Sequence, residues 1–185
     1  PAACYRKFFG YLEPDFRISG INCIGHDPAY PVTDGWPHLV AQLIDHVSTH
    51  CRVPVLGVGH SLGGYLTFMA AVQRPELFKC IILLDAPILG YFKGTAFGML
   101  KRLGLTDRLT PGHATRERRR DWPSMEDMVA HFRRKKIFRH FDADCLRDYA
   151  TLGTVAEGAA RVRLLFDPEI EYQIYRSFPH DLVYY

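Results

Sequence analysis

Apolar residues recur at helical spacing over residues 2–12, and the pattern stops before Pro14, which predicts a short first helix. The stretch Phe16–Ile24 predicts a strand. Asp34-Gly-Trp-Pro37 then predicts the start of a second helix, with Asp34 as its cap and Pro37 in its first turn. The buried face of this helix is expected to carry Leu39, Val40, Leu43, Ile44 and Val47.

Two short apolar runs flank a third predicted helix. Val53–Val58 and Cys80–Leu84 do not alternate with polar residues, which predicts strands of a parallel sheet covered on both faces. Between them, Leu62–Gln73 predicts a helix that ends before Pro75. The order helix, strand, helix, strand, helix, strand predicts an α/β protein.

The character of the chain changes after Pro87. Residues 88–178 contain amphipathic helical stretches, Gly/Pro breaks and two basic runs, and they contain no convincing central strand. Ser124 is expected to cap one helix there, and Asp142 or Asp144 to cap the next. We therefore predict a helical insertion that stands above the sheet.

The composition excludes several classes of protein. With 48% hydrophobic and 23% charged residues, the 185-residue chain fits one globular domain, with or without an inserted subdomain. Its 23 Lys and Arg against 20 Asp and Glu leave a formal net charge of +3, too near balance for a polyanion-binding protein. No nucleic-acid-binding module accompanies the charge, so no nucleic-acid partner is predicted.

Cysteine usage and hydropathy bear on location. The five cysteines are odd in number, scattered and without a CxxC pair, which argues against a disulfide framework and a cysteine-based zinc site. We therefore expect a reducing compartment and predict a cytoplasmic location. The longest stretch free of formal charge, residues 53–73, is broken by Pro54 and several glycines, so no integral membrane segment is predicted.

One segment carries a chemical signature. Gly59-His-Ser61-Leu62-Gly63-Gly64 lies between a predicted buried strand and a predicted helix, which favours a nucleophile elbow. In such a turn the serine backbone is strained, and we expect larger residues at Gly59 and Gly63 to collide. Ser61 is then the candidate nucleophile. The amide of Leu62, at a helix N-terminus, is a candidate donor to an oxyanion.

With this elbow, the sequence resembles the α/β-hydrolase family, and more narrowly its esterase-, lipase- and acyltransferase-like members. The stretch 74–87 is similar to the family's helix exit and next strand, and Gly25-His26 to its Gly-His, although Asn22 stands where an aspartate is usual. The resemblance extends over nearly the whole chain.

The resemblance implies a partial α/β-hydrolase fold of parallel strands, flanking helices and a helical cap. It places a partial core with three strands at residues 1–87, the cap at 88–178 and the start of the returning core at 179–185. The family's oxyanion loop would precede Pro1, and its usual acid and base histidine would follow Tyr185. We therefore expect a chain truncated at both ends and inactive alone.

The resemblance leaves the remaining catalytic groups open. None of the nine histidines is predicted as the base, although His180 would be the first to consider. Asp85, at the end of the strand after the nucleophile helix, is an alternative acid, because some family members use that position. Its other interpretation is an aspartate that holds a loop amide.

The function implied is that of a serine hydrolase in which Ser61 attacks an ester, thioester or amide carbonyl and forms an acyl-enzyme. The expected substrate is small, apolar and ester-like, and neither an organic cofactor nor a metal is implied. The alternative is a non-catalytic relative, or a truncated product, that binds a partner through the basic cap. The sequence indicates neither the oligomeric state nor the identity of the substrate.

Overall fold

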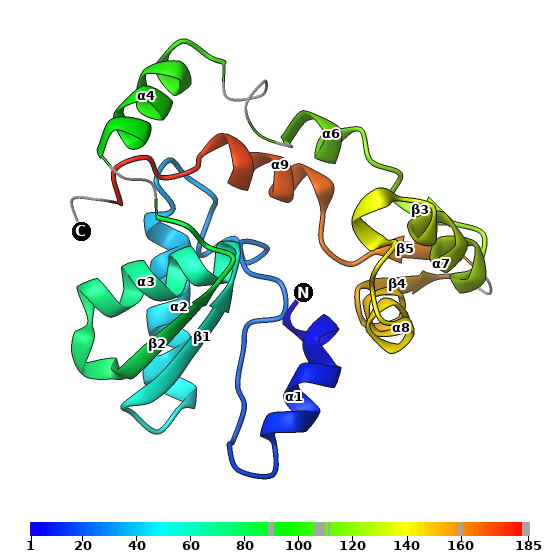
Figure 1. Cartoon of the computed structure of the whole chain (residues 1–185), viewed down its shortest axis with the longest axis horizontal. Helices are drawn as coiled ribbons and strands as arrows, with labels where there is room; N and C mark the ends of the chain where they lie inside the picture. Colours follow the sequence, from blue (N-terminus) through cyan, green and yellow to red (C-terminus); the bar gives the residue numbers. More distant parts are fainter. Residues whose placement is uncertain (89–90, 106–109, 111, 159–160, 183–185) are drawn as a thin grey trace. The chain divides into compact units, whose positions relative to one another are not determined.

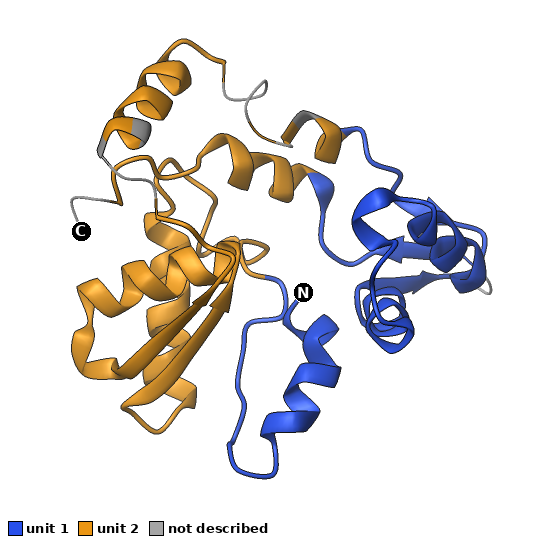
Figure 2. Cartoon of the chain, in the orientation of Figure 1, with its two compact units in different colours: residues 1–23, 117–168 blue, residues 24–116, 169–185 orange. Residues whose placement is uncertain are grey.

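The computed structural model describes residues 1–88, 91–105, 110, 112–158 and 161–182. It divides into two compact units that interleave along the sequence (Figure 2). Unit 1 consists of Pro1–Cys23 and Glu117–Pro168, and unit 2 of Ile24–Arg116 and Glu169–Tyr185. The division of the chain at residues 87 and 178 stays a prediction.

Unit 2 is built on two parallel strands joined by a helix (Figure 1). Strand β1 (Val55–His60) pairs with β2 (Phe78–Leu84) in a register that ends at His60 and Leu84. Helix α3 (Leu62–Gln73) connects the strands and packs against both, and α2 (Pro37–His50) packs against α3. A 3-10 turn, η2 (Pro75–Leu77), leads into β2. The predicted strand–helix–strand unit is confirmed, with the helix at the predicted residues.

Only one face of this two-stranded sheet is covered. Gly57 and Gly59 of β1 are buried, and an added Cβ at either would meet α3. On the opposite face the side chains Leu56, Val58, Ile82 and Leu84 are 40–49% exposed. The predicted cover on both faces is therefore wrong for the described residues. The sequence misleads here because glycines occupy buried positions of β1, so the strand cannot show the usual alternation.

The predicted strand at Phe16–Ile24 is also wrong. Residues 16–21 are irregular, and residues 22–25 form a turn. A strand needs a neighbour to complete its hydrogen bonds, but β1 pairs with β2 alone among the described strands. Asn22 instead accepts hydrogen bonds from the helical start of the chain, at its carbonyl from Ala2 N (3.3 Å) and at Oδ1 from Ala3 N (3.0 Å).

The helices before the sheet follow the sequence more closely. A 3-10 turn, η1 (Ala2–Tyr5), and α1 (Arg6–Leu12) confirm the first predicted helix. Pro37 begins α2 as predicted. Asp34, however, does not cap α2: Trp36 holds that position with a left-handed backbone (φ 63°). The Asp34 carboxylate pairs instead with Lys101 of α4 (Tyr91–Arg102), which removes it from the helix end.

Trp36 ties the start of α2 to the end of α9 (Pro168–Arg176). Its indole Nε1 donates to the Ile174 carbonyl (3.1 Å) and to Ser177 Oγ (3.0 Å), and only 2% of the residue is exposed. The ring meets Phe178 edge-on at 5.3 Å. A further short helix of unit 2, α6, covers Gly112–Arg116.

Unit 1 contains a small antiparallel sheet that sequence analysis missed. Strand β5 (Arg161–Leu164) lies between β3 (Asp121–Trp122) and β4 (Thr154–Glu157). Helices α7 (Met125–Arg133) and α8 (Ala143–Leu152) pack beside it, with the 3-10 turn η3 (Lys136–Phe138) between them in sequence. Two to four residues per strand give too short an alternation to stand out. The local signal that the sequence does contain is Gly158, which follows β4 directly and has φ +72°.

The helix caps in unit 1 were predictable because each depends on local sequence. Ser124 Oγ accepts a hydrogen bond from Asp127 N at 3.1 Å and caps α7. Asp142 Oδ1 accepts from Asp144 N (2.9 Å) and Cys145 N (3.4 Å), so Asp142, of the two candidates, caps α8. The core between these elements is formed by Trp122, Met128, Phe132, Leu146, Ala150, Val162 and Leu164.

His131 makes the stability of unit 1 sensitive to pH. Its ring lies 5.6 Å from the Trp122 ring and 5.4 Å from that of Phe132. Burial lowers the pKa of His131, and the nearby charges of Lys135, Arg119 and Arg134 lower it further. Because the unfolded chain binds the proton more tightly, this stability is present above about pH 6.5 and is lost as the pH falls.

We therefore expect unit 1 to melt at lower temperature as the pH falls from about 7 to 5, and His131→Gln to flatten this dependence. Circular dichroism melts at a series of pH values measure the effect. His140→Gln is the matched control, because His140 is exposed. An unchanged pH slope in the His131 variant would contradict the assignment.

Within the described residues, no helix combines the length and apolar character needed to cross a membrane.

Candidate active site

Ser61 lies in the sharp turn between β1 and α3, at the residue where the strand ends and the helix begins. Its backbone has φ 50° and ψ −120°, a conformation that non-glycine residues rarely adopt. Its amide donates to the Leu84 carbonyl at 2.9 Å, and this bond ties the turn to the end of β2. The structure therefore has the strained strand–turn–helix geometry that the sequence predicted at this serine.

The close approach of β1 to α3 depends on Gly59. A Cβ at Gly59 would overlap the Gly63 carbonyl group and lie 2.5 Å from Gly64 N. At Gly64, an added Cβ would meet that of Ala86 at 2.5 Å. At Gly63 it would find nothing within 4 Å. The steric reason predicted for Gly59 thus applies. The reason predicted for Gly63 belongs instead to Gly64, a glycine of the motif for which no steric role was predicted.

The hydroxyl and two amides of this turn remain available. Ser61 is exposed, and its side chain makes no capping hydrogen bond to α3. The Ser61 carbonyl accepts from Gly64 N (2.9 Å) and Tyr65 N (3.2 Å). In the described part of the chain, the amides of Leu62 and Gly63 have no acceptor, as is usual in the first turn of a helix. Two N–H donors therefore lie directly after the serine.

Asp85 follows β2 immediately, one residue after the carbonyl that holds Ser61 N. It has a left-handed backbone (φ 47°) and an exposed side chain. Burial raises the pKa of Tyr65, in the first turn of α3, and the Asp85 charge raises it further. Asp85 is therefore near the elbow helix. None of the hydrogen bonds among the described residues joins it to Ser61.

Tyr65 is a neighbour of the elbow that sequence analysis missed. Its hydroxyl donates to the Pro87 carbonyl at 2.9 Å, so it bridges α3 to the segment after β2. Its ring meets Trp36 (6.1 Å between centroids) and Phe178 (5.0 Å). Trp36 directly precedes α2 and Phe178 lies just after α9. These positions are far apart in sequence, so no local pattern could have predicted the contacts.

Among the described residues, neither His60 nor His180 contacts the Ser61 hydroxyl. His60 ends β1 and is exposed on the uncovered face of the sheet. The ring of His180 instead packs against α4, where a Cβ added at Gly98 would collide with it. His180 also lines a pocket of about 580 Å³ with Lys101 and Arg176, and Ser61 is not among the described residues that line it.

A metal site does not emerge from the titratable residues. Over the described ranges, no three His, Cys, Asp or Glu side chains are grouped so as to hold an ion. The elbow itself offers a hydroxyl beside two free amides.

Comparison with known proteins adds to this geometry. Residues 2–184 match the family model described as the Alpha/beta hydrolase family. A monoglyceride lipase of Rattus norvegicus is 41% identical over 54 residues, 27% of this chain and 18% of the lipase. A type I acyl-CoA thioesterase of Penicillium brevicompactum is 30% identical over 104 residues, 56% of this chain and 22% of the thioesterase. The matches thus span less than a quarter of either relative.

Solved structures share the fold. The crystal structure of E-2-(acetamidomethylene)succinate hydrolase superposes with a TM-score of 0.69 at 18% identity, covering 97% of this chain and 62% of that one. A thioesterase domain from the curacin biosynthetic pathway superposes with a TM-score of 0.52 at 20% identity, covering 80% of this chain and 50% of that one. The likeness extends over both units of the present chain in the first case.

Proposed function

Because the chain belongs to the alpha/beta hydrolase family, we propose that it carries the nucleophile of a serine hydrolase. The observation that carries this proposal is the backbone of Ser61, held at φ 50° between β1 and α3. Strain of this kind persists only where surrounding contacts enforce it, and it is concentrated at functional sites. The Leu84 carbonyl and the glycines of the turn enforce it here.

The proposed reaction begins when Ser61 Oγ attacks the carbonyl carbon of the substrate and gives its proton to a general base. The Leu62 amide donates to the negative oxygen of the tetrahedral intermediate; losing such a donor typically costs about 3 kcal/mol of barrier. Collapse breaks the bond to the leaving alcohol, thiol or amine, which takes up a proton. Water then attacks the acyl group on Ser61, releases the acid and restores the hydroxyl.

The substrate class is supported by the names of the relatives. One is a lipase and another a thioesterase, so an ester or a thioester is favoured over an amide. We propose a small substrate with an apolar acyl group, since the partly exposed rings of Tyr65 and Phe178 meet beside the first turn of α3. No cofactor takes part in the proposed reaction.

Asp85 is the proposed acid of the site, an assignment secondary to that of Ser61. It follows the strand whose last carbonyl binds Ser61 N, and its charge acts on Tyr65 in the first turn of α3. A carboxylate at this position would orient a protonated base and stabilise its positive charge.

The test is covalent labelling with a fluorophosphonate probe in the protein that carries this sequence. We expect one labelled serine, Ser61, and complete loss of labelling in Ser61→Ala. Ser48→Ala is the matched control, because Ser48 is exposed on α2 and lies outside the elbow; it should label as the wild type does. Peptide mass spectrometry identifies the modified residue.

Labelling that persists in Ser61→Ala would contradict the assignment of the nucleophile. A folded protein without any labelled serine would favour the alternative, a non-catalytic relative that acts by binding. If Asp85 is the acid, Asp85→Asn should slow labelling by a factor of about 10² or more, whereas an aspartate that only holds a loop would leave the rate unchanged.

A further inference from the structure

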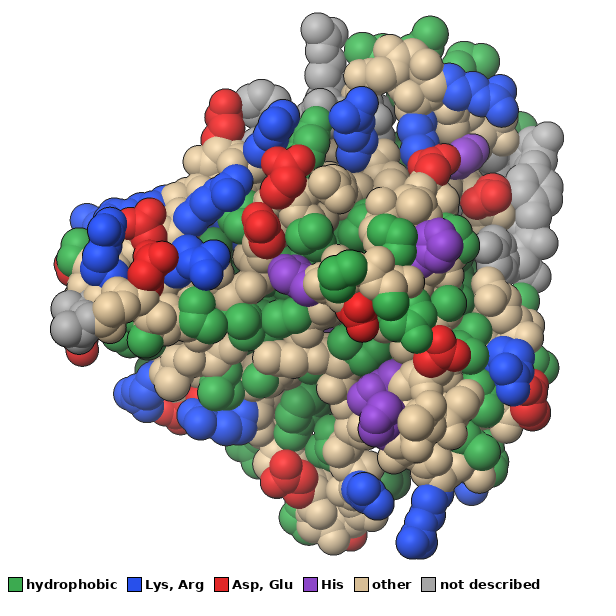
Figure 3. All heavy atoms as spheres, turned by 180° about the vertical axis from the view of Figure 1, so that it is seen from behind, with side chains coloured by type: hydrophobic (Ala, Val, Ile, Leu, Met, Phe, Trp, Pro, Cys, Tyr) green, Lys and Arg blue, Asp and Glu red, His purple; other side chains and the backbone are tan. Residues whose placement is uncertain are grey.

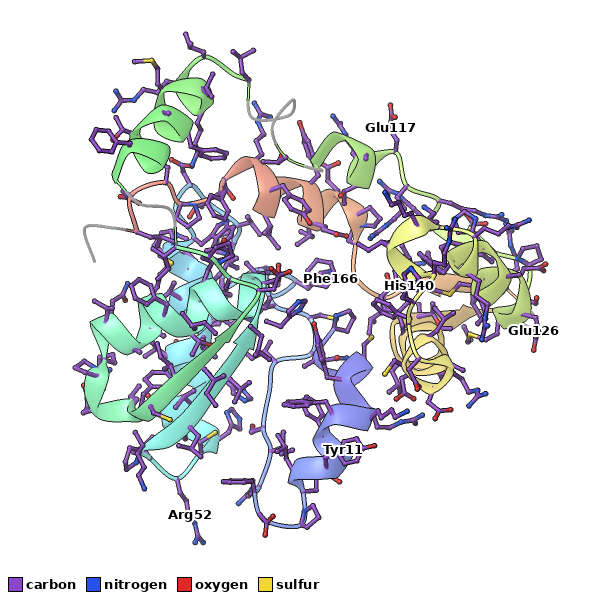
Figure 4. All side chains as sticks on the ribbon, viewed as in Figure 1. Tyr11, Arg52, Glu117, Glu126, His140 and Phe166 are labelled. Atoms are coloured by element: carbon purple, nitrogen blue, oxygen red, sulfur yellow. The ribbon has the colours of Figure 1, made fainter. Side chains whose placement is uncertain are left out.

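A segment of unit 1 exposes basic and apolar side chains together. The segment Arg133–Phe141 runs from the last residue of α7 through η3 to the turn before α8. We call its exposed side chains the 133–141 patch: Arg133, Arg134, Lys136, Ile137, Arg139, His140 and Phe141. His140 is labelled in Figure 4.

The cations of the patch are not neutralised by neighbouring acids. Figure 3 shows lysine and arginine side chains interspersed with acidic ones over one face. Within the described residues, none of the four cations of the patch forms an ion pair. The acids that follow in sequence are already bound, Asp142 by Lys7 and Asp144 by Lys7 and Arg147. The patch therefore presents four uncompensated positive charges within seven residues.

The apolar side chains of the patch are held outward by packing on their inner side. Phe138 lies 4.8 Å from Phe132 and 5.3 Å from Tyr149, ring to ring, and so anchors η3 to the core of unit 1. With Phe138 directed inward, Ile137 is 73% exposed and Phe141 47% exposed. An aliphatic side chain on this anchored turn projects from among the cations.

We propose that the 133–141 patch docks unit 1 on a membrane surface rich in anionic phospholipid. Lysine and arginine side chains meet the negative headgroups, and Ile137 and Phe141 enter the boundary between headgroups and acyl chains. Nucleic acid would engage the cations equally but would leave Ile137 and Phe141 in water. The combination of charge with an exposed aliphatic tip therefore favours the lipid surface.

The test is sedimentation of the chain with vesicles. We expect little binding to phosphatidylcholine alone and strong binding when about a third of the lipid is phosphatidylserine. Arg133→Glu/Arg134→Glu should weaken binding to the anionic vesicles by about 100-fold or more, since each charge near the surface contributes roughly fivefold. Ile137→Ser should weaken it severalfold, and raising the salt concentration should release the bound protein.

Matched controls separate the patch from general charge and hydrophobicity. Arg17→Glu/Arg52→Glu changes the net charge equally at exposed arginines outside the patch; Arg52 extends from the loop before β1 (Figure 4). Leu103→Ser removes a 65% exposed leucine from unit 2. Both controls should bind as the wild type does. Circular dichroism checks that each variant folds. If Arg133→Glu/Arg134→Glu does not fold, the binding of Ile137→Ser and the salt series still test the proposal.

Three results would overturn the proposal. The first is equal binding of the chain to neutral and to anionic vesicles. The second is that Arg17→Glu/Arg52→Glu weakens vesicle binding as much as Arg133→Glu/Arg134→Glu does. The third is that Ile137→Ser leaves vesicle binding intact while duplex DNA competes with the vesicles. The last would identify a polyanion site instead. Sedimentation does not depend on Ser61, so its outcome is distinguishable from the labelling test of the proposed function.

Discussion

Replacing Gly59 by alanine is expected to destabilise unit 2 by about 3 kcal/mol or more and to abolish labelling of Ser61. The added Cβ would overlap the Gly63 carbonyl group and approach Gly64 N. Both belong to the backbone of the first turn of α3, which cannot rotate away as a flexible side chain does. Relief requires α3 to move off β1, and that movement displaces Ser61, which connects them.

The matched control is Gly63→Ala, two residues on the other side of the serine. Nothing lies within 4 Å of a Cβ at Gly63, and alanine is favoured over glycine in a helix by about 1 kcal/mol. We expect this variant to fold at least as stably as the wild type and to label normally. Chemical denaturation and the fluorophosphonate probe measure both effects. Equal damage from the two substitutions would contradict the described packing of the elbow.

The contrast between these glycines marks what the sequence could predict about the site. A serine flanked by glycines between an apolar run and a helix is a local pattern, and it correctly predicted the strained turn at Ser61. Which glycine packs closely depends on where α3 lies over the strands. Gly64 is constrained by Ala86, which lies beyond the end of β2. The spacing of residues along the sequence does not reveal that these two residues are close in space.

The same distinction explains the fold-level errors. Helix α3 and the caps at Ser124 and Asp142 depend on residues within one turn of each other, and they were predicted. Strands depend on partners elsewhere in the chain. Phe16–Ile24 has the composition of a strand, but none of the described strands pairs with it. Arg161–Leu164 had two partners but only four residues in which to show its alternation.

Trp122 is the residue on which the core of unit 1 should depend most, and Trp122→Ala is expected to cost about 3–5 kcal/mol. The side chain is fully buried, and its ring lies 5.5 Å from that of Phe132. Its strand, β3, has only two residues, Asp121 opposite Arg163 and Trp122 opposite Val162. Because so short a strand forms few hydrogen bonds, we expect burial of the Trp122 indole to contribute most of the free energy that holds β3 in unit 1.

Trp122→Phe should cost much less than the alanine substitution. Within the described residues the indole Nε1 of Trp122 is buried without a hydrogen-bond partner, so phenylalanine gives up volume but no hydrogen bond. Trp36 is the matched comparison, because its Nε1 donates to Ile174 and Ser177. Trp36→Phe leaves the buried Ile174 carbonyl without that donor and should cost about 1–3 kcal/mol more than Trp122→Phe.

Hydrogen exchange read by mass spectrometry localises these effects. In Trp122→Ala, peptides from α7, α8 and β5 should lose protection, because these elements contribute residues to the same core. Peptides from β1, α3 and β2 should keep theirs, since they belong to the other compact unit. Uniform loss of protection across both sets would show that the two units unfold together, and unchanged protection around α7 would mean that Trp122 does not hold this core.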